Sequence, residues 1–180
     1  AVLKERLQKM LSVFNYGTLP FYWGRFEPEE GSPLTEITKQ GAWWLKERGI
    51  KTKGHPLCWH TVCAPWLMQY DNRTILDKQL ARIRREVTDF KGLIDTWDVI
   101  NEAHDPIVKG NDLNLNTEQV FEITALACKA THDADPTATR IVNINRPWGE
   151  YRSEWESMDP MHAIEYLEEL QRRNIEFEVV

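Results

Sequence analysis

The sequence predicts an α/β fold, namely part of a (β/α)8 TIM barrel. Short β-rich runs alternate with longer helical runs along the 180 residues, and this alternation is typical of parallel βαβ units. The glycine-rich phosphate turns of open nucleotide-binding sheets do not occur in the sequence. A complete barrel takes about 250 residues. We therefore expect residues 1–180 to be one partial barrel, truncated at both ends, with about strands 2 to 6 and their helices.

The expected elements follow one another in order along the chain. Apolar residues at helical spacing predict helices over 1–13, 33–48, 76–90, 117–133 and 160–173. Runs rich in β-branched and aromatic residues predict strands over 14–18, 50–60, 95–101, 140–145 and 175–180. Ser32-Pro33 and Asp159-Pro160 each pair a capping residue with a proline suited to the first helical turn.

Composition excludes several classes of protein. Lys and Arg number 22 against 28 Asp and Glu, so a sequence-independent binder of nucleic acid is not expected. A membrane span is excluded, because the chain has no run of 18 apolar residues. Eight Trp residues argue against intrinsic disorder. Nothing in the sequence implies an oligomer.

The three cysteines do not indicate a disulfide framework or a metal site. An odd number of cysteines leaves one unpaired. Cys58, His60 and Cys63 lie close together in the sequence, but their spacing matches no standard zinc-ligand set. We expect no metal and no cofactor.

Polar side chains at strand ends, with aromatic residues in the nearby loops, indicate a sugar site. Reacting groups of a barrel lie at the carboxyl ends of its strands. Sugar rings offer apolar C–H faces and hydroxyl edges, which suit flat aromatic rings and a few placed polar groups. The candidate residues at these positions are Trp23, His60, Trp66, Asn101, Glu102, Asn145 and Trp148.

Glu102 is the strongest of these candidates for a catalytic residue. It follows the expected buried strand 97–101, and strand alternation places Asp98, Ile100 and Glu102 on one face. A carboxyl group beside apolar walls can have a raised pKa and serve as a general acid for a departing glycosidic oxygen. The adjacent Asn101 can donate a hydrogen bond to a sugar hydroxyl. The alternative is an ordinary Asn-Glu pair that opens a surface loop.

Several motifs resemble glycoside hydrolase family 10, the retaining endo-β-1,4-xylanases. Trp97-Asp-Val-Ile-Asn-Glu102 is similar to the acid/base strand of that family, and Gly54-His-Pro-Leu-Cys-Trp-His60 to its preceding strand. Pro65-Trp66, the segment 27–31, and Val142-Asn-Ile-Asn145 are similar to further family segments. The resemblance runs in order over nearly the whole chain.

The resemblance implies a role for each matched residue. Glu102 would be the acid/base, Asn101 and His60 would contact the sugar next to the scissile bond, and Trp66 would wall the subsites. His60 could instead be a core histidine, and Trp66 could be loop packing. Trp59 is interpreted as packing, pointing away from the face of His60, and so are Trp43 and Trp44. Family members are commonly exported, so the resemblance implies an extracellular or periplasmic location.

Two segments depart from the family pattern. The family has Pro-Glu-Asn-Glu-Met-Lys-Trp where this chain has Thr18-Leu-Pro-Phe-Tyr-Trp23, so Trp23 can align with the family Trp. The Glu, Asn and Lys side chains with which the family binds one sugar are absent. The family's Asn-Asp-Tyr-Asn becomes Asn145-Arg-Pro-Trp148. These changes indicate a divergent branch, and they make Trp23, Asn145 and Trp148 candidate contacts to an altered or decorated substrate.

Retaining hydrolysis needs a second carboxylate, about 5–5.5 Å from the first. In the family this nucleophile lies on the seventh strand, which this chain does not reach. Asp98 lies deeper and is expected to be a core carboxylate, Glu178 lies too early on its strand, and Glu150 in a loop is a weak substitute. We expect the nucleophile to be missing from this chain, the chain alone to be inactive, and an unclosed barrel to self-associate or be molten.

The sequence therefore leads to one main functional hypothesis and two alternatives. The main hypothesis is a retaining glycoside hydrolase that cleaves internal β-1,4-glycosidic bonds of a plant polysaccharide, with xylan as the first candidate and oligosaccharide as partner. One alternative is a non-catalytic carbohydrate-binding pseudoenzyme. The other is a related barrel glycosidase acting on β-glucan or mannan.

Overall fold

The computed structural model describes residues 2–104, 112–148 and 161–180. Glu150 and Asp159-Pro160 lie outside these ranges. The longer helices fall where the sequence predicts them, and their bounds are α1 Val2–Val13, α3 Thr35–Lys46, α4 Asn72–Asp89, α6 Thr117–Ala134 and α7 Ala163–Arg172. Two short helices lie in segments expected to be loops: α2 Trp23–Phe26 and the 3₁₀ turn η1 Pro65–Gln69.

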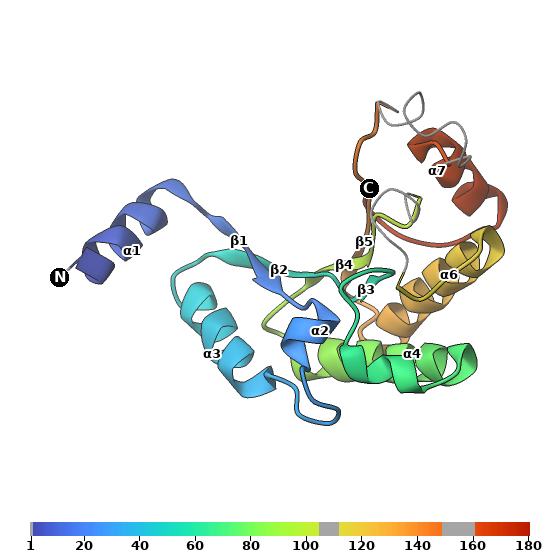
Figure 1. The fold of residues 1–180 in the computed structure, drawn as a ribbon. Coiled ribbons are helices and arrows are strands. Elements are labelled where there is room, and N and C mark those ends of the chain that lie inside the picture. The colour runs from blue at the N-terminus through green and yellow to red at the C-terminus, as the bar shows by residue number, and fades with distance from the viewer. Residues whose placement is uncertain (1, 105–111, 149–160) are drawn as a thin grey trace.

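The strands form one parallel sheet. Their bounds are β1 Tyr16–Pro20, β2 Lys51–His55, β3 Cys58–Trp59, β4 Thr96–Asn101 and β5 Thr139–Asn143. They are ordered β1-β2-β4-β3 along the sheet, and β5 pairs with β4. Figure 1 shows α3, α4 and α6 on the convex side of this curved sheet, while its concave side is open. The predicted partial (β/α) barrel is confirmed.

The predicted strand 50–60 is in fact two strands. β2 ends at His55 and β3 begins at Cys58, with Pro56 between them. Proline has no backbone N–H and cannot continue a ladder. Leu57 instead donates its N–H to the Asp98 carbonyl at 2.9 Å. β3 thereby pairs with β4 near the carboxyl end of β4.

Capping groups set the helix starts, and the start of α3 differs from the prediction. Asn116 and Gln119 form a capping box at α6, directly before the helix predicted over 117–133. Ser32-Pro33 does not begin α3, which starts at Thr35. The Leu34 N–H is hydrogen bonded to the Phe26 carbonyl at 2.8 Å, which holds the preceding residues to α2. Sequence signals for a cap do not reveal this longer-range bond.

The core lies between the convex face of the sheet and the helices. Trp97, Ile100 and Val142 of the sheet are buried in one cluster with Ile83 of α4 and Phe121 of α6. Burial of such apolar surface is the main favourable term in folding. The helix-facing side of the sheet therefore forms the hydrophobic core, and its other side is where a functional site can lie.

The chain around the final predicted strand is nearly unpaired. Within 175–180, a single β-bridge joins Ile141 and Val179, and the Val142 N–H donates to the Val179 carbonyl at 2.9 Å. Glu178 instead holds Arg140, with the guanidinium Nη2 2.5 Å from Oε1. Glu178 therefore serves β5 as an ion-pair partner and does not project toward the open face.

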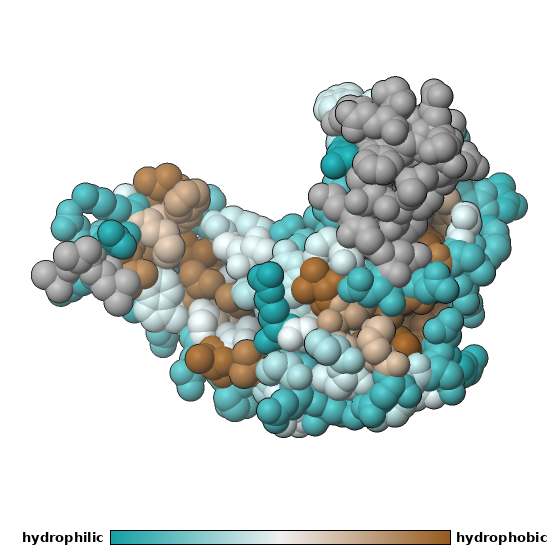
Figure 2. Space-filling model, viewed as in Figure 1, coloured by the Kyte–Doolittle hydropathy of each residue, from teal (hydrophilic) through white to brown (hydrophobic). Residues whose placement is uncertain are grey.

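The surface near the amino terminus is apolar. Figure 2 shows hydrophobic residues gathered where α1 meets β1, and Val13 and Phe14 there are 74% and 59% exposed. Among the described residues, no helix is long and apolar enough to cross a membrane.

Candidate active site

The strand register defines which side chains share the open face. Thr18 of β1 lies opposite Lys53, and Lys53 lies opposite Thr96 of β4. Directly paired residues of neighbouring strands project to the same side of a sheet. Alternation then adds His55 and Asp98 to that side. The helix-facing positions between them hold Gly54 and Trp97, and a Cβ added at Gly54 would overlap the Trp97 ring.

A register shift in β4 brings Asn101 to the open face. Asp98 pairs with Ile141 and Ile100 pairs with Val142, so one extra residue, Val99, lies between them on β4. Val99 and Ile100 are both buried in the helix-facing core. The predicted common face for Asp98, Ile100 and Glu102 is therefore wrong for Ile100, because a bulge interrupts the alternation.

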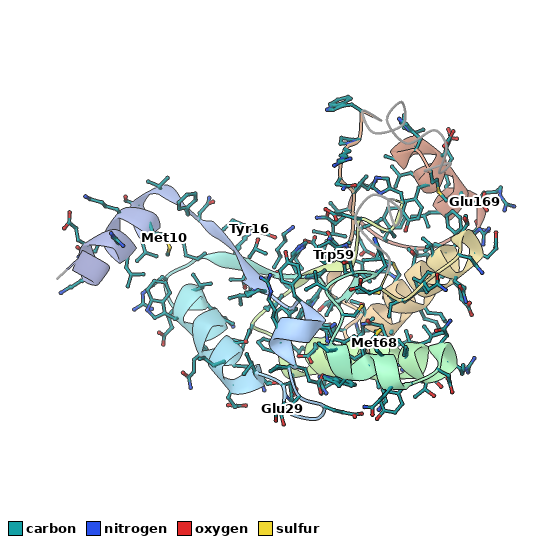
Figure 3. All side chains as sticks on the ribbon, viewed as in Figure 1. Met10, Tyr16, Glu29, Trp59, Met68 and Glu169 are labelled. Carbon is teal, nitrogen blue, oxygen red and sulfur yellow. The ribbon has the colours of Figure 1, made fainter. Side chains whose placement is uncertain are left out.

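Asn101 lies at the centre of the strand ends. It pairs with Trp59 of β3 on one side and with Asn143 of β5 on the other. All three side chains therefore project to the same face as Asp98, and the Asn143 Nδ2 atom lies 3.5 Å from Asp98 Oδ2. In Figure 3, Trp59 lies on the concave side of the sheet, whereas Glu29 lies below it, on the side of the helices.

Glu102 directly follows Asn101 in an unusual backbone conformation. Its φ is +52°, a left-handed value that non-glycine residues seldom adopt and that is concentrated at functional sites. The Glu102 N–H donates to the Asn143 carbonyl at 2.8 Å, which fixes the residue between the ends of β4 and β5. Its side chain is half-buried. The carboxyl group is thus carried on a rigid strand end, as a catalytic group requires.

Asp98 is a core carboxylate, as the sequence predicts. Its side chain has no exposed surface, and its Oδ2 atom lies 2.7 Å from Lys53 Nζ and 2.5 Å from His55 Nδ1. Burial would raise the pKa of Asp98, but hydrogen bonds from His55 and Lys53, together with the Lys53 charge, outweigh burial and lower the pKa. Asp98 therefore stays ionised and anchors two side chains of β2.

An aromatic corner, formed by Tyr22, His55 and Trp59, adjoins these polar groups. The Tyr22 ring lies 5.4 Å from the His55 ring and 5.6 Å from the Trp59 ring, between centroids. The interpretation of Trp59 as packing that points away from the site is wrong, because β3 pairs Trp59 with Asn101. Tyr22 lies in the loop whose aromatic residues the sequence indicates for a sugar site, whereas sequence reasoning missed His55. The polar residues Lys53 and His55 alternate along β2, and this alternation was the sequence signal that could have placed His55 on the open face.

His60 and Trp23 are buried. They are 3% and 6% exposed, which leaves almost no surface for a sugar ring. Trp23 donates its indole N–H to Glu27 at 3.1 Å and packs edge-on against Trp66. The placement supports the alternative of a core histidine for His60, and it does not support direct substrate contact by Trp23.

Trp66 belongs to the same packed cluster. Its indole N–H donates to the Glu27 carbonyl at 2.9 Å, and Lys78 Nζ lies 6.0 Å from its ring. Glu27 is held in turn by Arg85, 2.7 Å away. These contacts come from α2, η1 and α4, on the helix side of the molecule, so the structure does not bring Trp66 together with Asn101 and Glu102.

The described part of the segment after β5 begins beside the site. The Asn145 carbonyl lies 3.0 Å from Nε2 of the buried His104, which follows Glu102 by two residues. Asn145 is thus next to the Glu102 loop. Trp148 is 86% exposed. It has the open surface that a substrate contact needs, at the outer end of this segment.

The described residues offer no metal site. No group of three or more His, Cys, Asp or Glu side chains within 2–104, 112–148 and 161–180 could hold a metal ion. Burial raises the thiol pKa of Cys58 and of Cys63 to about 12.

Curated relatives are xylanases of greater length. Endo-1,4-beta-xylanase B of Neocallimastix patriciarum is 25% identical over 134 residues, which cover 72% of this chain and 15% of that protein. Endo-1,4-beta-xylanase A of Thermotoga maritima is 31% identical over 108 residues, 56% of this chain and 10% of that protein. The chain thus spans a small part of the length of these relatives.

Solved structures show the same fold. Xylanase XynB from Paenibacillus barcinonensis superposes with a TM-score of 0.76 at 21% identity, over 99% of this chain and 55% of that one. Xylanase 10B from Thermotoga petrophila, solved with xylobiose, gives 0.74 at 20% identity, over 96% and 52%. The chain matches about half of each barrel. The sequence profile described as Glycosyl hydrolase family 10 matches residues 21–180, and the chain therefore belongs to glycosyl hydrolase family 10.

Proposed function

We propose that the protein is a retaining glycoside hydrolase that cleaves internal β-1,4-glycosidic bonds of xylan, with Glu102 as the general acid/base. The observation that carries this proposal is the Asn101-Glu102 step at the carboxyl end of β4. Asn101 lies on the open face between Trp59 and Asn143, and the Glu102 backbone is fixed to β5. The two curated relatives described above, both xylanases by name, suggest the substrate class.

The proposed reaction has two steps at one anomeric carbon. In the first, Glu102 gives its proton to the departing glycosidic oxygen while a carboxylate nucleophile bonds to the anomeric carbon. In the second, Glu102 takes a proton from water, the water oxygen bonds to the same carbon, and the nucleophile leaves. Net configuration is retained, and both carboxyl groups return to their initial states.

The nucleophile is proposed to lie outside this chain. Asp98 shares the open face, but its side chain has no exposed surface and its Oδ2 atom is held by Lys53 and His55. Glu178 is paired with Arg140. Neither group is available to attack a sugar, so these 180 residues alone are expected to be inactive, since loss of one member of a catalytic pair costs several orders of magnitude in rate.

The proposed sugar contacts combine predicted and newly found residues. Asn101 supplies an amide to a hydroxyl group, and the aromatic corner of Tyr22, His55 and Trp59 supplies flat surface beside it. Asn145 and Trp148 are proposed to contact the substrate further out. His60, Trp23 and Trp66 support these contacts through packing.

The test is hydrolysis by the protein as its gene encodes it. Xylan, mixed-linkage β-glucan and mannan are offered in parallel, and the anomer first released from a defined xylo-oligosaccharide is followed by proton NMR. The proposal predicts hydrolysis of xylan with the β-anomer formed first. Preference for β-glucan or mannan would overturn the substrate, and an initial α-anomer would overturn the retaining mechanism. Sugar binding without any turnover would favour a pseudoenzyme.

A further inference from the structure

A small cavity lies between the aromatic corner and α4. Its volume is about 10 Å³, and its lining includes Trp59 of the corner, Arg82 and Gln79 of α4, and Thr61 of the loop after β3. A cavity needs about 10–15 Å³ to hold one water molecule. This cavity therefore has room for a single water molecule and for nothing larger.

Two of the side chains around this cavity have a buried N–H group without an acceptor. Within the described residues, neither Trp59 Nε1 nor Arg82 Nε has a hydrogen-bond partner. Arg82 is 3% exposed, and its Nη1 and Nη2 atoms already donate to the Leu57 and Phe21 carbonyls. Buried N–H groups in native proteins are nearly always paired, and ordered water pairs those that the protein does not. The two nitrogen atoms therefore point to a shared water molecule.

The cavity wall also offers acceptors for the hydrogen atoms of such a water. A buried water makes about three hydrogen bonds, so two accepted bonds leave at least one to donate. Gln79 Nε2 donates to the Leu57 carbonyl at 3.0 Å, which leaves the amide oxygen of the same side chain as an acceptor. Thr61 adds a hydroxyl group. The lining thus offers two donors and two acceptors, which is the complement that one water molecule uses.

A small anion is the other ligand that such a pair of N–H groups attracts, and the surroundings oppose it. Chloride is larger than a water molecule, which already fills the cavity. Arg85 pairs with Glu27 and with Glu86, at 2.7 Å each. Glu86 also acts on Arg82 as an opposite charge. Two guanidinium groups thus face two carboxyl groups, and the Arg82 charge needs no further anion.

We propose that one water molecule binds in this cavity and joins Trp59 Nε1 to Arg82 Nε, which makes Arg82 a positioning residue for the Trp59 ring. The Tyr22 ring packs against the Trp59 ring, 5.6 Å away between centroids. With the bound water, the indole is held at its N–H edge as well. A ring that is fixed in one orientation loses less conformational freedom when a ligand binds to it. The water site follows from the cavity alone, whereas its effect on sugar binding rests on the proposed function.

Three variants separate the bound water from the other contacts of Arg82. Arg82→Lys keeps the positive charge and a donor for the backbone carbonyls but has no Nε–H group. Arg84→Lys is the matched control, because it makes the same change at an exposed position of the same helix. Thr61→Leu fills the cavity from the loop side and leaves Arg82 unchanged, so it carries the test if Arg82→Lys does not fold.

The first experiment locates the water by crystallography of the protein as its gene encodes it, with crystals grown from bromide in place of chloride. One water peak is expected within about 2.7–3.2 Å of both Trp59 Nε1 and Arg82 Nε, with no anomalous signal from bromide. The peak is expected to be missing in Thr61→Leu. A wild-type map without this peak would overturn the inference, and an anomalous bromide peak at the same place would overturn it in favour of an anion.

The second experiment measures what the water does to Trp59. The indole N–H signal of Trp59 is assigned in ¹⁵N spectra with Trp59→Phe. Arg82→Lys and Thr61→Leu are expected to shift this signal and to weaken xylotriose binding, measured by calorimetry, about three- to tenfold, the range expected for one hydrogen bond. Arg84→Lys should change neither.

The outcomes distinguish this inference from the proposed function. An unchanged Trp59 signal and an unchanged xylotriose affinity in Arg82→Lys and Thr61→Leu would overturn the positioning role. A bound water in a wild type that binds no xylotriose would leave the water site standing and would overturn the proposed function.

Discussion

Substitution of Arg82 by Met tests how the active-site loops are held to the helix layer. Arg82 lies on α4 and is 3% exposed. Its Nη1 donates to the Leu57 carbonyl at 2.5 Å, and its Nη2 donates to the Phe21 carbonyl. These two carbonyls directly precede Tyr22 and β3, which carry the aromatic corner. Burial lowers the pKa of Arg82 to about 10, so the guanidinium is still charged at neutral pH.

The size of the effect follows from the bonds that Met cannot make. A hydrogen bond to a charged group contributes about 1.5–3 kcal/mol. The Leu57 carbonyl keeps a second donor, Gln79 Nε2 at 3.0 Å, whereas Phe21 keeps none among the described side chains. We therefore expect Arg82→Met to cost about 2–4 kcal/mol. In a complete barrel of about 250 residues, that corresponds to a fall in melting temperature of roughly 5–15 °C.

The assay is thermal unfolding followed by circular dichroism, with Arg84→Met as the control. Arg84 lies on the same helix and is exposed, so its substitution should change stability by no more than about 0.5 kcal/mol. If the two variants melt at the same temperature, the buried guanidinium does not hold the loops and the reasoning is refuted.

Three further predictions concern other parts of the fold. Gly54→Ala should destabilise by about 1–3 kcal/mol, because the added methyl group overlaps a buried indole. Gly41→Ala lies in a helix, where the added methyl group makes an ordinary contact with Leu19 at 3.8 Å, and should stabilise by up to about 1 kcal/mol. Urea unfolding compares the two variants. Hydrogen bonds from its arginine partner and from backbone and indole N–H groups outweigh burial and lower the pKa of Glu27, so its stabilising contribution is complete above the unfolded value of 4.5 and is lost as the pH falls below it. Melting temperatures between pH 6 and pH 3 should therefore fall less steeply in Glu27→Gln than in the wild type, and equal slopes would contradict this. Cys58 and Cys128, both buried with pKa values raised to about 12 by burial, should resist a thiol reagent at pH 8 until urea is added, and rapid labelling of the native protein would count against the described packing.

Local signals predicted most of the fold because they act over a few residues. The capping group at Asn116 and the helical spacing of apolar residues place α6 correctly. The strand before Glu102 was recognisable because Trp97, Val99 and Ile100 give it the β-branched and aromatic composition of a buried strand. The Asn101-Glu102 step at its end needed no tertiary information.

Features that depend on distant partners could not be read from the sequence. The bulge at Val99 is visible only through the register with β5. The burial of Trp23 depends on Glu27, which in turn is held by Arg85, 58 residues away. Trp59 and His55 reach the open face because Pro56 separates two strands that the sequence pattern merges into one.

The central claim is that Glu102 is the proton donor, and the dependence on leaving group tests it most directly. Glu102→Gln and a control, Glu29→Gln, are each assayed on xylan and on an aryl xylobioside whose leaving group needs no proton. Glu29 is an exposed carboxylate on the other side of the molecule. The account predicts that Glu102→Gln lowers kcat on xylan by about 10²–10⁴-fold and the first step on the activated substrate far less, while Glu29→Gln changes neither. Equal losses on both substrates, or full activity of Glu102→Gln on xylan, would contradict it.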